Sequence, residues 1–259
     1  MGPFCIFAEI RSNSSIKNKL KQLMSNSKSS AAAFADTKPH YDLLDGLRGV
    51  AALMVIFYHV FEAFATSPID QQFNHGYLAV DFFFILSGFV IGYAYDDRWK
   101  TMTTKDFIKR RLIRLHPVVL GAVLGVIAFC IQGCEKWDGT HVSISMVMLA
   151  LLINLFLIPA VPGSGPEIRG NGEMFPLNGP SWSLFFEYIG NIMYALFIRR
   201  MSTKALMALI VLAGIGLASF AIFNFSGAGH LGVGWTMEEY NLIGGFLRVL
   251  FSFSMGLLM

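Results

Sequence analysis

The chain alternates between long apolar stretches and short polar ones, and this pattern predicts helices that cross a membrane. A helix needs about 20 mainly apolar residues to cross the hydrocarbon core of a bilayer. Several stretches approach that length, so we predict an all-α, polytopic transmembrane helical bundle with about seven apolar segments. The expected segments lie near residues 47–65, 77–95, 117–132, 144–162, 182–198, 205–224 and 242–259.

Composition supports this class. Of 259 residues, 54% are hydrophobic and 14% are charged, whereas a soluble domain of this length would carry more charge and shorter apolar runs. The formal net charge of +3 is too small to indicate a nucleic-acid partner. The three cysteines do not form a disulfide framework. Cys130 and Cys134 are four residues apart and could meet, but we interpret them as ordinary apolar thiols.

The first 40 residues differ from the rest. They are rich in Ser and Lys, then in Ala, and they lack the apolar stretch of a secretory signal. We predict a disordered cytoplasmic tail over residues 1–40 and a membrane domain over residues 41–259, with Asp45 as the N-cap of its first helix. Because the sequence stops inside an apolar run, we also expect that C-terminal helices of this domain are missing.

The distribution of lysine and arginine predicts the orientation. Residues 1–40 carry six, residues 96–116 carry seven, and residues 66–76 carry none. The positive-inside rule therefore places the N-terminus and residues 96–116 in the cytoplasm. If every later segment crossed, the basic residues at 199–204 would lie outside, against the rule. Either 117–132 is re-entrant or another piece between 117 and 181 breaks the alternation.

Two ionisable residues lie within the first apolar segment. Arg48 and His59 are separated by ten residues. Eleven helical residues turn through about 1100°, so both side chains share one face, roughly 16 Å apart along the axis. Ionisable groups in a membrane helix are costly and normally face a cavity or a partner. We therefore expect this pair to be functional, with a substrate or other groups spanning the gap between the two residues.

Two later segments also carry carboxylates. Asp81 lies one turn inside the second segment. It could orient the imidazole of His59, or it could be an ordinary charge at the start of a helix, stabilised by the positive end of the helix dipole. Glu187 forms a polar stripe with Ser183 and Asn191 at spacings of four. That stripe either borders a water-filled cavity or makes structural hydrogen bonds between helices.

Residues 103–117 predict a short basic helix between the second and third segments. Thr103 and Asp106 are spaced as a capping box, and Pro117 is expected to end the helix. The basic face either lies on anionic lipid or binds a phosphorylated donor. It contains Lys109, Arg110, Arg111 and Arg114.

These segments together resemble the acyltransferase-3 family, whose members are bacterial membrane proteins that O-acylate glycans. The resemblance extends over residues 41–259, with four motifs in the same order and spacing. They are Leu44-Asp45-Gly46-Leu47-Arg48 with His59, the segment Val80–Phe89, Arg110-Arg111-x-x-Arg114-x-x-Pro117, and Trp182-Ser183-Leu184 with Glu187.

The resemblance implies an enzyme of the bacterial inner membrane that moves an acyl group, expected to be acetyl, from acyl-CoA to a hydroxyl of a cell-envelope or extracellular glycan. It implies no permanently bound cofactor and no metal. By position, His59 is the catalytic base or acyl carrier, with Arg48 as its partner. The other implied residues are Asp81 and Glu187 as catalytic groups, Trp182 and Ser183 as substrate contacts, and Arg110, Arg111 and Arg114 as contacts to the phosphates of coenzyme A.

Two other interpretations stay open. The same ionisable residues could line the pathway of a membrane transporter, because buried charges also mark solute and proton routes. An incomplete chain could instead be an inactive fragment or a scaffold.

Overall fold

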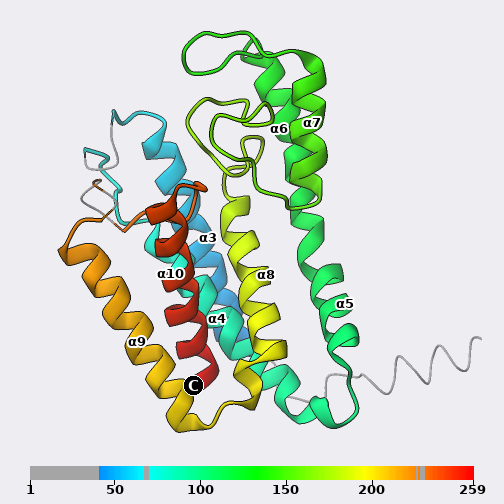
Figure 1. The fold of residues 1–259 in the computed structure, drawn as a ribbon, viewed down its shortest axis with the longest axis vertical. Helices are drawn as coiled ribbons and strands as arrows, with labels where there is room; N and C mark the ends of the chain where they lie inside the picture. Colours follow the sequence, from blue (N-terminus) through cyan, green and yellow to red (C-terminus); the bar gives the residue numbers. More distant parts are fainter. Residues whose placement is uncertain (1–40, 67–69, 226, 228–230) are drawn as a thin grey trace, which may run out of the picture. The chain divides into compact units, whose positions relative to one another are not determined.

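The computed structural model describes residues 41–66, 70–225, 227 and 231–259. The predicted tail over residues 1–40 lies outside this range. The described residues form helices and turns, with two isolated β-bridges and no strand, which confirms the all-α prediction (Figure 1). The helices are α3 (Asp42–Glu62), α4 (Leu78–Tyr95), α5 (Thr104–Leu115), α6 (Gly121–Ile131), α7 (Ile144–Leu155), α8 (Ser181–Leu196), α9 (Thr203–Ile222) and α10 (Glu239–Leu258); the short 3-10 helices are η1 (Asp96–Lys100), η2 (His116–Leu120) and η3 (Ile198–Arg200).

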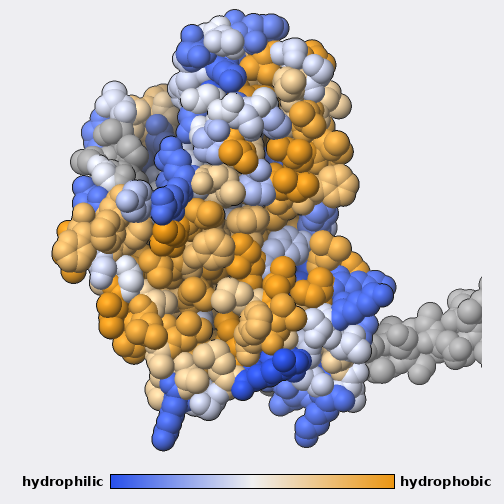
Figure 2. Space-filling model, viewed as in Figure 1, coloured by the Kyte–Doolittle hydropathy of each residue, from blue (hydrophilic) through white to orange (hydrophobic). Residues whose placement is uncertain are grey.

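Five helices in the described part of the chain are long and apolar enough to cross a membrane, fewer than the seven segments expected. They are α3, α4 with η1, the continuous helix Thr104–Ile131, α9 and α10. On the face drawn in Figure 2, hydrophobic residues cover the middle of the molecule and hydrophilic ones gather at both ends. The five helices make this an integral membrane protein.

The third candidate span tests three expectations. Helix α5 ends at Leu115, and Pro117 lies in the 3-10 turn η2 that follows, as expected from the proline. The turn leads directly into α6, so Thr104–Ile131 is one helical stretch long and apolar enough to cross a membrane. Its start agrees with the sequence: Thr103 and Asp106 form a capping box. Helix α3, however, begins at Asp42, so Asp45 is not its N-cap.

Helix α7 is shorter than the segment expected at residues 144–162. This helix has 12 residues and spans about 18 Å at ~1.5 Å per residue, little more than half of a bilayer core. It runs back beside α6, and after a folded loop α8 continues in the same direction (Figure 1). Helices α7 and α8 therefore follow one another in the same direction. The basic turn η3, which follows α8, lies near the loop after α4, because the guanidinium of Arg199 is 4.0 Å from the ring centre of Trp99 in η1.

The core forms where α4, α8 and α10 pack together. Gly88 of α4 and Gly256 of α10 permit this approach, because a Cβ at Gly88 would lie 2.0 Å from the carbonyl oxygen of Phe253. A Cβ at Gly256 would lie 1.9 Å from the carbonyl oxygen of Ile85. Small residues allow such close backbone contact between membrane helices. The α4–α10 pair thus provides a rigid base for the groups around it.

Helix α3 packs much more loosely than the others. Only 6% of its apolar window is buried. Ala51 is its buried residue, and near its C-terminal end Gln71 donates a hydrogen bond to the carbonyl oxygen of Tyr58, while the ring of Phe73 meets Phe57 edge-on and Phe61 at a tilt. Two cavities lie between other parts of α3 and helices α4 and α8.

Candidate active site

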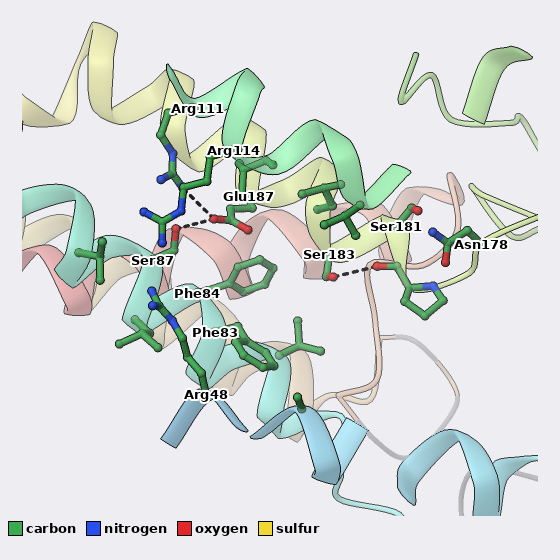
Figure 3. Close-up of a pocket in the computed structure, with 18 residues that line it drawn as sticks. Arg48, Phe83, Phe84, Ser87, Arg111, Arg114, Asn178, Ser181, Ser183 and Glu187 are labelled. Atoms are coloured by element: carbon green, nitrogen blue, oxygen red, sulfur yellow. Dashed lines mark hydrogen bonds and ion pairs between the residues drawn. The ribbon is translucent and has the colours of Figure 1, made fainter. Parts of the chain in front are cut away.

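The larger cavity, called here the arginine cavity, lies between α3, α4, α5 and the start of α8 and has a volume of about 650 Å³. Arg48 enters it from α3, whereas Arg111 and Arg114 enter from α5 (Figure 3). Arg110 is absent from the residues that line it. Three guanidinium groups therefore face one space, and such groups bind phosphate through paired hydrogen bonds.

Glu187 joins three helices at the wall of this cavity. Its Oε1 atom accepts a hydrogen bond of 2.7 Å from Ser87 on α4 and lies 3.0 Å from Nη2 of Arg111 on α5. The Arg111 side chain is only 3% exposed, so this ion pair is largely removed from water. Because a buried arginine is costly without a counter-charge, Glu187 stabilises Arg111 at the cavity wall.

Arg48 and Arg114 are less confined. The Nη1 atom of Arg48 lies 2.8 Å from Oδ1 of Asp45, one helical turn earlier, and both side chains are partly exposed. Arg114 is exposed and borders the same space. The basic segment does not behave as a helix lying flat on lipid, because Phe107 and Arg111 of α5 are buried against the bundle. Its basic residues are instead divided between the cavity and the outer surface.

A second cavity of about 240 Å³ contains His59 and is called here the histidine cavity. Trp182 and Ser183 also line it. The two cavities are neighbours, because the same residues form part of the wall of each. These shared residues are Ala52, Val80, Phe83, Pro180 and Ser183.

The structure does not bring Asp81 to His59. The Nδ1 atom of His59 lies 2.8 Å from Oε2 of Glu62, its neighbour one turn later in α3. Asp81 instead forms a two-point pair with Arg248 of α10: Nη2–Oδ2 is 2.8 Å and Nε–Oδ1 is 3.1 Å. The physical reason is the burial of Arg248, which requires a counter-charge from the facing helix. Glu62 thus occupies the position expected for Asp81.

Sequence reasoning missed Arg248. Its side chain is 1% exposed and also donates hydrogen bonds to the carbonyl oxygens of Val233 and Tyr77. The guanidinium lies 5.2 Å from the ring centre of Trp182, which lines the histidine cavity. An arginine inside the apolar run 242–259 was the available signal, because such a residue normally has a partner.

Comparison with known proteins places these residues in a family. The sequence pattern of the family described as "Acyltransferase domain" matches residues 41–259. The chain belongs to the acyltransferase-3 family. The predicted motif residues Arg48, His59, Arg111, Arg114 and Glu187 therefore lie within the family's domain, and all five line one of the two cavities.

The chain is also similar to individual proteins. The chain is 34% identical to "Protein 2 in picA locus" of Rhizobium radiobacter over 68% of this chain and 91% of that protein. It is 28% identical to the "Exopolysaccharide production protein ExoZ" of Rhizobium meliloti over 60% of this chain and 43% of ExoZ. It is 36% identical to the "O-acetyltransferase OatA" of Staphylococcus aureus over 33% of this chain and 13% of OatA. The matches therefore span less than half of ExoZ and OatA. No solved structure matches the chain.

The loop between α7 and α8 adds a further carboxylate on the same side of the fold as Glu62. Glu173 is held by Asn171, whose Nδ2 atom donates a hydrogen bond of 2.8 Å to Oε1. Burial raises the pKa of Glu173, and the negative charge of Glu62 acts in the same direction, whereas the bond from Asn171 opposes the rise. Among the described residues, no group of three or more His, Cys, Asp or Glu side chains could hold a metal ion.

Proposed function

We propose that this acyltransferase-3 protein transfers an acyl group, with acetyl as the expected one, from acyl-CoA to a hydroxyl of a cell-envelope or extracellular glycan. The observation that carries the proposal is the wall shared by the arginine cavity and the histidine cavity. In this proposal a donor extends past the shared wall, from the three guanidinium groups of the arginine cavity to the imidazole of His59. The guanidinium groups bind its phosphates, and the imidazole acts on the acceptor hydroxyl. The name of OatA, an O-acetyltransferase, and that of ExoZ, an exopolysaccharide production protein, support the acyl group and the acceptor class.

The donor fits this path by its chemistry. Coenzyme A carries phosphates at one end and a thioester at the other, joined by an extended pantetheine arm. In the proposed mode the phosphates lie against Arg48 and Arg114, with Arg111 contributing from the wall. The arm passes Ala52 and Phe83 and brings the thioester to His59. This arrangement bridges the roughly 16 Å that separate Arg48 and His59 along α3.

The proposed reaction uses His59 as a general base. A sugar hydroxyl is a poor nucleophile at neutral pH, and a neutral imidazole within hydrogen-bond reach can accept its proton. Glu62 at 2.8 Å from Nδ1 favours the tautomer that leaves Nε2 free to act. The hydroxyl oxygen then forms an ester bond with the acyl carbon, the carbon–sulfur bond breaks, and the coenzyme A thiolate takes the proton from His59.

The proposed orientation follows from the charges. The basic loop after α4 and the basic turn after α8 lie at one end of the bundle. The positive-inside rule then assigns this end to the cytoplasm, with the N-terminus on the same side, in the bacterial inner membrane. The donor would enter from the cytoplasmic end, and the acceptor would reach His59 from the opposite end.

The test is calorimetric binding of acetyl-CoA to the full chain in detergent. Each charge-assisted hydrogen bond contributes about 1.5–3 kcal/mol, so Arg114→Ala should weaken binding roughly 10- to 100-fold. Lys109→Ala is the matched control, because it removes one positive charge from the exposed face of the same helix. His59→Ala should retain binding and lose transfer to a glycan acceptor. Equal weakening by Arg114→Ala and Lys109→Ala, or full transfer by His59→Ala, would contradict the proposal.

A further inference from the structure

The end of α6 brings two thiols together. Cys130 lies in the last turn of the helix and Cys134 lies just beyond it, with 3.3 Å between the two Sγ atoms. The chain reverses here because Gly133 and Cys134 both have positive φ, 95° and 55°. The amide of Cys134 then donates a hydrogen bond of 3.0 Å to the carbonyl oxygen of Phe129, a pattern typical of helix C-termini.

Both cysteines are held in defined positions. The carbonyl oxygen of Cys134 accepts a hydrogen bond of 2.7 Å from the amide of Val142, and Glu135 pairs with His141 in an isolated bridge. The two residues differ in access, since Cys134 is buried and Cys130 is exposed. The hydrogen bond between the thiols raises the pKa of Cys134. Cys130 is therefore the thiol that can meet a reagent first.

The position of the pair in the fold decides its chemistry. The end of α6 lies opposite the end that carries the basic loop after α4 and the turn after α8 (Figure 1). In the orientation of the proposed function, on which this step rests, the pair faces the outside of the cytoplasmic membrane. Disulfides form and persist in that oxidising environment, whereas cytoplasmic thiols are kept reduced.

We propose that Cys130 and Cys134 are a modification site and form a disulfide in the cell envelope. The oxidant is a protein of the thiol–disulfide exchange class. The Cys130 thiolate attacks the donor disulfide and releases one donor thiolate; the Cys134 thiolate then attacks the mixed disulfide and releases the second. Two cysteine thiols are oxidised, the donor is reduced to two thiols, and the two protons pass to the donor. Bond formation needs the sulfur atoms to approach from 3.3 Å to about 2.05 Å.

The bond would brace the loop that borders the arginine cavity. Phe129, beside Cys130, lies under the guanidinium of Arg169, 5.5 Å from ring centre to Cζ. The Nε atom of Arg169 donates a hydrogen bond of 2.9 Å to the carbonyl oxygen of Pro176. Two residues later, Asn178 lines the arginine cavity. Fixing the α6 end to its following loop therefore stabilises one wall of that cavity.

The experiment uses the full chain with Cys5→Ser, so that only the pair reacts. Membranes are quenched with a thiol-alkylating agent in denaturant, with and without prior reduction, and the labels are counted by mass spectrometry. We expect no label without reduction and two labels after it. In the control with Cys130→Ser, Cys134 should take one label without reduction. Two labels on the unreduced parent protein would overturn the proposal.

A second arm separates the causes of such a failure. The purified, reduced protein is treated with oxidised glutathione and counted in the same way, and acetyl-CoA binding is measured on the same sample. Pairing in the purified protein but not in cells would overturn the native disulfide and leave the geometry of the pair intact. If no disulfide formed either in cells or in the purified protein, the proximity of the Cys130 and Cys134 sulfur atoms would be wrong. In both cases retained acetyl-CoA binding would leave the catalytic proposal standing.

Discussion

The pair between Asp81 and Arg248 gives the sharpest prediction on stability. The two residues are 167 positions apart and tie α4 to α10 through two charge-assisted hydrogen bonds. The Asp81 side chain is 20% exposed and that of Arg248 only 1%, so loss of the carboxylate leaves a buried guanidinium without its counter-charge. Asp81→Asn should therefore destabilise the bundle far more than a surface change of the same kind.

The magnitude follows from the contacts. Two hydrogen bonds to a charged group contribute about 3–6 kcal/mol together, and breaking one side of a buried ion pair costs about 3–5 kcal/mol. Because Asn retains one acceptor for Arg248, we expect the lower limit, about 3 kcal/mol, which is roughly a hundredfold in the unfolding equilibrium. The matched control is Asp45→Asn, which removes the exposed partner of Arg48 and should cost about 0.5 kcal/mol or less.

The assay is unfolding in mixed micelles with increasing SDS, followed by tryptophan fluorescence and circular dichroism. Apolar replacement of both partners, Asp81→Leu with Arg248→Met, should recover much of the loss, since a buried ion pair can be exchanged for packing at small cost. A free energy of unfolding for Asp81→Asn within about 1 kcal/mol of that for Asp45→Asn would refute the reasoning. If folded Asp81→Asn bound acetyl-CoA but lost transfer, the catalytic role predicted from the sequence would stand instead.

Three further predictions follow from the contacts. Gly88→Ala places a Cβ 2.0 Å from the carbonyl oxygen of Phe253 and should cost about 3 kcal/mol or more in SDS unfolding, whereas Gly46→Ala meets no atom within 4 Å and should be neutral or slightly stabilising. Burial raises the pKa of Glu173 above its ordinary value of 4.5, so ionisation destabilises the folded state as pH rises above that value; Glu173→Gln should flatten this fall in melting curves recorded at increasing pH. Acetyl-CoA should slow amide hydrogen exchange in α3, which is 6% buried, and no change would contradict donor contact with Arg48.

Local rules predicted the elements that depend on neighbouring residues. Helical periodicity placed Arg48 and His59 on one face of α3, and each lines one of the two neighbouring cavities. The spacing of Thr103 and Asp106 predicted the capping box at the start of α5. Both features depend on residues within a few turns of one another, so a single sequence is sufficient to find them.

Features set by distant contacts were not predictable. The partner of Asp81 lies on α10, and no local pattern distinguishes Arg248 from His59 as that partner. The short helix α7 looked like a full span because apolar residues continue to Pro162, although the chain leaves the helix at Leu155 and folds into a loop.

The weakest-packed helix carries the residues on which the proposed reaction depends. Helix α3 contributes Arg48 to the arginine cavity, His59 to the histidine cavity and Ala52 to both, yet it has few tertiary contacts beyond its C-terminal end. The opposite walls belong to α4 and α8, which pack in the core. Any displacement of α3 therefore changes both cavities together, whereas the Arg111–Glu187 pair stays with the rigid part. A donor that contacts Arg48 at one end and His59 at the other would fix α3 against that wall, so donor binding and assembly of the catalytic site become one event.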